Sequence, residues 1–133
     1  MTYQRRDEIQ FDDGAAAQRV ALRDNITIRR AAIDASSSGD NTLVAAVAGK
    51  RIKVLAVLLV AAEAVDATVY TGPQATGTAL TGTISLADNE GFVLPAPVDP
   101  AQHWLATASG EALTLYLSAA KQVSGCVVYY EEA

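Results

Sequence analysis

From Ile26 onward, apolar and polar residues alternate in short runs that are separated by turn residues. An alternation with a period of two is typical of β-strands that bury one face. The turns are marked by groups such as SSSGDN at 36–41, and Pro95, Pro97 and Pro100 keep a later loop out of any strand ladder. We therefore expect strands at 26–33, 42–48, 51–62, 65–70, 80–86, 92–94, 103–108, 113–117 and 125–131.

The longest of these runs, 51–62, contains the stretch VLAVLLVAA, which is apolar at consecutive positions. A strand that is apolar on both faces is usually buried on both sides. The pattern therefore predicts a central strand whose two faces are both covered.

Strands that recur about every ten residues with turns between them favour an antiparallel β-sandwich or jelly roll. No amphipathic helix of the kind that a βαβ fold needs is visible after Ile26. The prediction is an all-β domain of about eight strands at 26–133. Residues 1–25 are polar and rich in arginine, and we expect them to form an N-terminal extended arm, with a short helix an option at 14–25.

Composition narrows the classes of partner. Half of the chain is hydrophobic, so a true core is expected, and the net charge is −5. Residues 1–30 sum to +1 and the rest to −6, which disfavours nucleic acid as a partner of the folded domain. The longest apolar run is too short for a membrane helix, and the N-terminus does not resemble a signal peptide. We expect a protein made in a cytoplasm that binds no membrane.

The sequence contains few candidate catalytic groups. His103 is the single histidine, and neither a GxSxG elbow nor a phosphate-binding glycine loop is present. Cys126 is the single cysteine, which excludes an intrachain disulfide and predicts a buried, inert thiol. A pair of carboxylates that cleaves a glycosidic bond is conceivable among Asp66, Asp88, Glu90, Asp99 and Glu111, but we interpret each as a surface residue. We expect no enzyme activity, no cofactor and no metal.

Features that indicate protein partners are more numerous. Exposed strand positions are rich in alanine, threonine and serine but poor in lysine, the residue that commonly protects strand edges from association. Trp104, the single tryptophan, is interpreted as a core or interface anchor. The candidate partner-binding residues are Trp104 and the arginines Arg5, Arg6, Arg19, Arg23, Arg29 and Arg30.

Three stretches resemble a group of small structural proteins of tailed bacteriophages and prophages. They are GDNTLVAAVAGK at 39–50, LTGTISLADNEG at 80–91 and TASGEALTLYLSAAKQVSG at 107–125. The resemblance covers about residues 36–131. It implies a β-sandwich virion component without enzyme activity, and within the virion a capsid decoration (cement) protein on the outer capsid surface.

By the same resemblance, the expected partners are the major capsid protein and further copies of the chain, as a homotrimer. The arm would then reach across capsomer boundaries. Two alternatives stay open. One is a tail fibre, baseplate or receptor-binding component, for which Trp104, Tyr70, Tyr116, Tyr129 and Tyr130 are candidate stacking groups. The other is a carbohydrate-binding module or small hydrolase.

Overall fold

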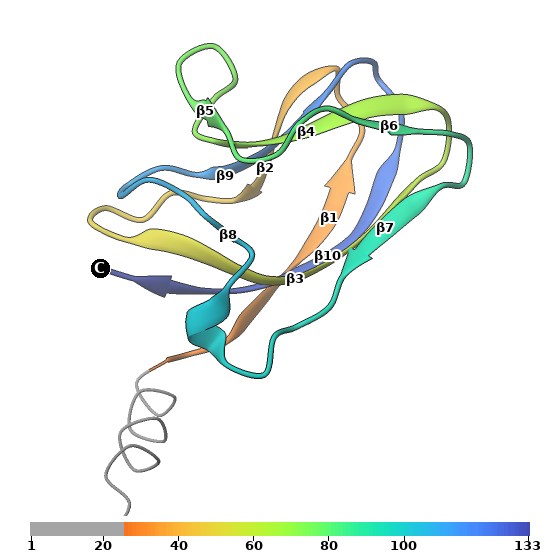
Figure 1. Cartoon of the computed structure of the whole chain (residues 1–133). Coiled ribbons are helices and arrows are strands. Elements are labelled where there is room, and N and C mark those ends of the chain that lie inside the picture. Colours follow the sequence, from red (N-terminus) through yellow and green to blue (C-terminus); the bar gives the residue numbers. More distant parts are fainter. Residues whose placement is uncertain (1–25) are drawn as a thin grey trace, which may run out of the picture.

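The computed structural model describes residues 26–133, which form two antiparallel sheets packed face to face (Figure 1). The all-β sandwich predicted from the alternation is therefore confirmed. The predicted arm, 1–25, and the helix considered within it lie outside the described residues.

Each sheet contains five strands. Sheet A has the order β1 (Arg29–Ala35), β10 (Val123–Glu132), β3 (Arg51–Ala61) and β7 (Gly91–Leu94), and β8 (Leu105–Ala106) pairs with β3 further along the edge occupied by β7. Sheet B has the order β2 (Gly39–Val44), β9 (Leu113–Leu117), β4 (Val65–Thr71) and β5 (Thr78–Ala79), and β6 (Ile84–Leu86) also pairs with β4. A short 3-10 helix, η1 (Pro100–Gln102), lies in the loop between β7 and β8.

The strand pairing follows the jelly-roll scheme. The first strand pairs with the last, β1 with β10, and the second pairs with the last but one, β2 with β9. Further in, β3 pairs with β7, and β4 pairs with β5 and β6. The chain thus runs as one long folded hairpin that wraps into two sheets, the topology expected of a jelly roll.

The core consists of the inward-facing residues of both sheets. On β9 these are Leu113, Leu115 and Leu117, which are fully buried and alternate with Thr114 and Tyr116 as the period-two pattern predicts. Their counterparts in sheet A include other aliphatic side chains with almost no exposure: Ile33, Ile52, Val54, Leu59, Ala61, Val123 and Val127. Alternation in sequence therefore translates directly into the two inner faces of the sandwich.

Several predicted boundaries are wrong. The turn at 36–41 is shorter than expected, because β2 already begins at Gly39, whose positive φ of 92° turns the chain sharply. Asn41 then donates a hydrogen bond from Nδ2 to the Ser37 carbonyl at 2.8 Å and closes the turn from within the strand. The strand expected at 42–48 ends at Val44, and the one expected at 103–108 is reduced to β8.

Candidate protein-binding surface

The outer face of sheet A carries a continuous group of apolar side chains. The strand register aligns Ala32 of β1, Cys126 of β10, Leu58 of β3 and Val93 of β7 in one row across the sheet. Neighbouring rows add further apolar groups from the central strands. We call this group the apolar face, and its members are Ala32, Ala56, Leu58, Val60, Val93, Cys126 and Val128.

The centre of the apolar face is open to solvent. The exposed fractions are 47% for Leu58, 42% for Val60 and 62% for Val93. The prediction that the central strand is covered on both faces is therefore wrong for this part of β3: the strand is central in its sheet, but only its inner face is covered. The sequence did contain the signal, since the apolar residues on the second face of this run are the ones left exposed.

Cys126 belongs to this face as well. It lies opposite Leu58 in the register and is half-buried, so the prediction of a buried thiol is wrong. The reason is the strand phase, because Val127 takes the inward position and leaves Cys126 pointing outward. A small apolar side chain at this place extends the apolar face onto β10.

The loop between β7 and β8 covers the other end of the outer face. Tyr130 follows Val128 on the outward side of β10, yet it is buried, and its hydroxyl donates to the Pro100 carbonyl at 3.1 Å. His103 packs edge-on against the Tyr130 ring, with ring centroids 6.5 Å apart. The loop thus confines the open apolar area to the half of the sheet near Leu58.

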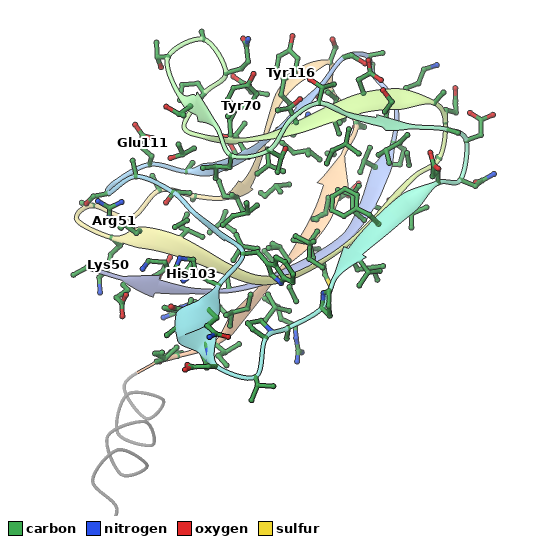
Figure 2. The ribbon with its side chains drawn as sticks, in the orientation of Figure 1. Lys50, Arg51, Tyr70, His103, Glu111 and Tyr116 are labelled. Atoms are coloured by element: carbon green, nitrogen blue, oxygen red, sulfur yellow. The ribbon has the colours of Figure 1, made fainter. Side chains whose placement is uncertain are left out.

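His103 is part of this packing. Its Nδ1 is buried without a hydrogen-bond partner, and burial followed by the nearby Lys53 charge lowers the pKa of the imidazole below its ordinary value of 6.5. Burial of the ring therefore favours its neutral form. Figure 2 shows His103 beside the 3-10 helix, at the side of the molecule that carries sheet A.

Trp104, the predicted anchor, projects from the same loop. Its indole Nε1 donates to the Pro95 carbonyl at 2.7 Å and its backbone nitrogen donates to the Val54 carbonyl at 2.8 Å. The side chain still has 48% of its surface exposed, and Val98 in the same loop is almost fully exposed. The loop therefore adds a fixed aromatic and an aliphatic group to the exposed apolar surface of the domain.

The apolar face is small compared with a stable interface. Across the sheet it spans four strands, and along β3 it runs from Ala56 to Val60. Standard strand spacing and rise per residue make this an area of roughly 14 Å by 14 Å. That is about 200 Å², against about 800 Å² per partner in a standard interface. Contact through the apolar face alone would therefore be weak.

The predicted partner-binding arginines divide into two groups. Arg5, Arg6, Arg19 and Arg23 lie outside the described residues. Arg29 begins β1, where its Nε lies 3.6 Å from a carboxylate oxygen of Glu131 in the same chain. Arg30 is exposed and lies opposite Val128 in the register, at the border of the apolar face.

The outer face of sheet B is different in character. Tyr70 and Tyr116 pack edge to face with centroids 6.1 Å apart, and Figure 2 shows them side by side. Around them lie hydroxyl groups, such as Thr68, whose Oγ1 is 3.3 Å from that of Thr83. The edge-on arrangement of the two rings does not form the flat platform on which a sugar ring stacks.

Two of the tyrosines considered for stacking are not accessible. Tyr129 faces the core, and Tyr130 lies beneath the loop that follows β7, so both are buried. Only Tyr70 and Tyr116 are half-buried rather than buried.

Most of the carboxylates considered for glycoside hydrolysis accept hydrogen bonds from the protein itself. Asp88 accepts from the Ala64 backbone nitrogen at 2.7 Å, and Glu90 accepts from that of Ala87 at 2.7 Å. Asp99 caps η1, Glu111 accepts from the Thr71 hydroxyl at 2.7 Å, and Asp66 is exposed. Four of the five are therefore hydrogen-bonded within the sandwich, three of them in turns or loops and Glu111 to the last residue of β4.

Two other kinds of feature are absent from the part of the chain that the structure describes. Residues 26–133 contain no group of three or more histidine, cysteine or acidic side chains that could hold a metal ion. Within the same residues, no helix has the length and apolar character to cross a bilayer. No known protein family and no curated protein matches this chain. The surface itself therefore provides the grounds for a functional assignment.

Proposed function

We propose that this chain is a structural subunit of a virus particle, and specifically a capsid decoration protein that binds the outer surface of a phage head. The observation that carries the proposal is the apolar face of sheet A, with Leu58, Val60 and Val93 exposed at its centre. A protein partner that covers these side chains would remove apolar surface from water, which is favourable. A protein surface fits this face better than a sugar does, because its side chains are aliphatic or thiol groups and include no aromatic ring on which a sugar could stack.

A small contact area per copy is sufficient when many linked copies bind a symmetric shell. One contact of about 200 Å² is weak, but copies held together bind a symmetric shell with the gain of multivalency. Linkage between copies, as a homotrimer, supplies that gain. Trp104 and the two arginines that begin β1, Arg29 and Arg30, extend the contact beyond the apolar face.

The fold agrees with this proposal without selecting it. Jelly rolls occur in both viral capsid proteins and lectins, and a fold does not by itself assign a function. The phage-like stretches at 39–50, 80–91 and 107–125 favour the virion over the lectin class. The major capsid protein is the partner that the resemblance implies.

A binding assay with particles tests the proposal. Phage heads that lack this chain are mixed with wild-type protein or with the double variant Leu58→Lys, Val60→Lys, and the bound fraction is measured by sedimentation. We expect at least a tenfold loss of affinity in the variant, because two charges in the contact must be desolvated. The matched control is Thr42→Lys, Ser85→Lys, which adds the same charge at exposed positions of sheet B and should stay within twofold of the wild type.

The number of copies per particle separates the head from the tail. A decoration protein should be present at hundreds of copies, whereas a tail fibre or baseplate component should be present at a few to dozens. Wild-type affinity in the folded Leu58→Lys, Val60→Lys variant would contradict docking through the apolar face. Binding of the free protein to a glycan array, unaffected by these lysines, would instead favour the carbohydrate-binding alternative.

A further inference from the structure

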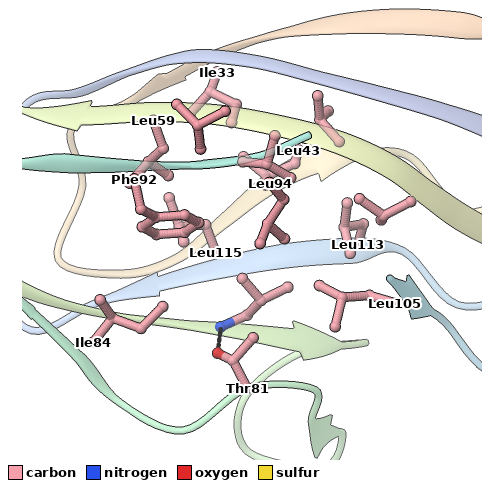
Figure 3. Close-up of a pocket in the computed structure, with 15 residues that line it drawn as sticks. Ile33, Leu43, Leu59, Thr81, Ile84, Phe92, Leu94, Leu105, Leu113 and Leu115 are labelled. Carbon is pink, nitrogen blue, oxygen red and sulfur yellow. Dashed lines mark hydrogen bonds between the residues drawn. The ribbon is translucent and has the colours of Figure 1, made fainter. Parts of the chain in front are cut away.

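A cavity of about 330 Å³ lies between the two sheets, and its lining is almost wholly apolar. Figure 3 shows side chains from both layers converging on it, among them Leu59 and Phe92 from sheet A and Leu115 from sheet B. Thr81 is the one polar residue of the lining, and its Oγ1 already accepts from the Val69 backbone nitrogen at 3.1 Å. The one polar side chain of the lining therefore already has a hydrogen-bond partner.

The cavity arises at the ragged edge of the sandwich. On β3, the edge strand β7 pairs only with residues 57–60 and β8 only with 53–54, which leaves a gap between them. On β4, β5 and β6 leave a similar gap at Thr68 and Val69, where the loop containing Leu80 and Thr81 bonds to the strand instead. Two interrupted edges facing each other leave a hollow that the strands do not fill.

The side chains around the hollow indicate that it is open on one side. Phe92 and Leu94 take the inward positions of β7, and Ile84 lies on β6, yet all three are only half-buried. Leu43, Val57 and Leu105 line the same cavity and are half-buried as well. Large apolar side chains that point inward and still contact solvent are typical of a binding cavity with a mouth.

A void of this size is unusual in a native core. Protein interiors pack as densely as organic crystals and rarely contain empty spaces larger than a water molecule. Water is held poorly here, because a buried water needs two to four polar partners and the one polar side chain of the lining, Thr81, is already hydrogen-bonded. An apolar molecule would recover the dispersion contacts that the lining lacks.

We propose that this cavity is a binding site for an uncharged, largely hydrocarbon molecule. No lysine or arginine lines it, so an ionised head group would find no counter-charge within the cavity. An engineered apolar cavity of about 150 Å³ holds one benzene molecule, so this one takes a ligand roughly twice that size. Its volume also falls at the lower end of the range of about 300–1,000 Å³ typical of small-molecule sites.

Fluorescence titration of the full chain with N-phenyl-1-naphthylamine, an uncharged probe, tests the site. We expect saturable binding that 1-decanol displaces more strongly than decanoate does. Val57→Phe fills the cavity and should weaken probe binding at least tenfold. The matched control Val60→Phe makes the same change on the outer face of the same strand and should shift affinity less than twofold.

Methyl NMR of the wild type keeps the test decisive if Val57→Phe does not fold. On addition of 1-decanol, the methyl signals of Val57, Val69 and Leu115 should shift, and those of Leu58 and Val60 should not. Absence of saturable binding, displacement by decanoate as strong as by 1-decanol, or shifts confined to Leu58 and Val60 would overturn the proposal. The Leu58→Lys, Val60→Lys variant should bind the probe normally, so this site and the docking surface can fail independently.

Discussion

At the scale of single residues, Thr107 shows how a polar side chain can be required inside an apolar core. It is fully buried, and its Oγ1 accepts a hydrogen bond from the Ile52 backbone nitrogen at 2.9 Å. Its own backbone nitrogen donates to the Ile52 carbonyl at 3.0 Å. The hydroxyl thus continues the ladder to β3 beyond the end of β8, where the backbone alone leaves a donor unpaired.

Replacing Thr107 with valine should destabilise the domain by about 1–3 kcal/mol, because the shape is kept while the buried Ile52 N–H loses its partner. The free energy of unfolding is measured by urea denaturation with circular dichroism as the signal. Thr107→Ser retains the hydroxyl and removes only a methyl group, so it should be the milder variant. A valine variant more stable than the serine variant would show that this hydrogen bond contributes little.

At the scale of elements, the backbones of β10 and β7 lie unusually close to the backbone of the central strand β3. A Cβ atom placed on Gly125 of β10 would lie 1.8 Å from the Leu58 carbonyl oxygen. On the opposite edge, a Cβ atom on Gly91 of β7 would lie 1.9 Å from the Leu59 carbonyl oxygen. Both neighbours of the central strand therefore depend on a residue without a side chain at the point of contact.

Gly125→Ala should accordingly cost about 3 kcal/mol or more, the upper part of the range for overpacking, because the strand backbone must move to admit the methyl group. The thermal midpoint and the urea midpoint both report the loss. Gly82→Ala is the matched control, since nothing lies within 4 Å of the position that its added methyl group would take. Equal stability of the two variants would mean that β10 and β3 separate at little cost.

At the scale of the whole molecule, the two outer faces differ in chemistry. Sheet A exposes aliphatic groups around Leu58, whereas sheet B exposes Thr42 and carries the half-buried Tyr70–Tyr116 pair. Under the proposed function, the outer face of sheet A would contact the protein partner and that of sheet B would face water. Within the described residues, 26–133, the buried hydrophobic side chains run from Ile33 to Tyr130.

We predict that removal of residues 1–25 leaves the sandwich folded, with a thermal midpoint within about 4 °C of the full chain, which corresponds to less than about 1 kcal/mol for a domain of this size. Binding to phage heads should weaken, because the predicted arm would no longer add contacts. Calorimetry and the sedimentation assay measure the two effects separately. Full affinity in the truncated protein would refute the role of the arm.

The sequence by itself determined the fold class, the position of most strands and the inward set of side chains. In runs such as 113–117, period-two alternation follows from the backbone geometry of a strand and needs no knowledge of neighbours. The residues at which strands begin and end were harder to predict from the sequence. Gly39 and Asn41 form their turn through φ and a side-chain hydrogen bond that composition alone does not place.

Only the tertiary structure decided which apolar positions remain open. Alternation divides a strand into two sides, but whether a second layer covers each side depends on loops and edge strands distant in sequence. Tyr130 is buried because a loop crosses it, while Leu58 stays exposed on the same sheet face, beyond the reach of that loop. The apolar face lies where the loop between β7 and β8 no longer covers sheet A, and the cavity lies where the edge strands of both sheets are interrupted.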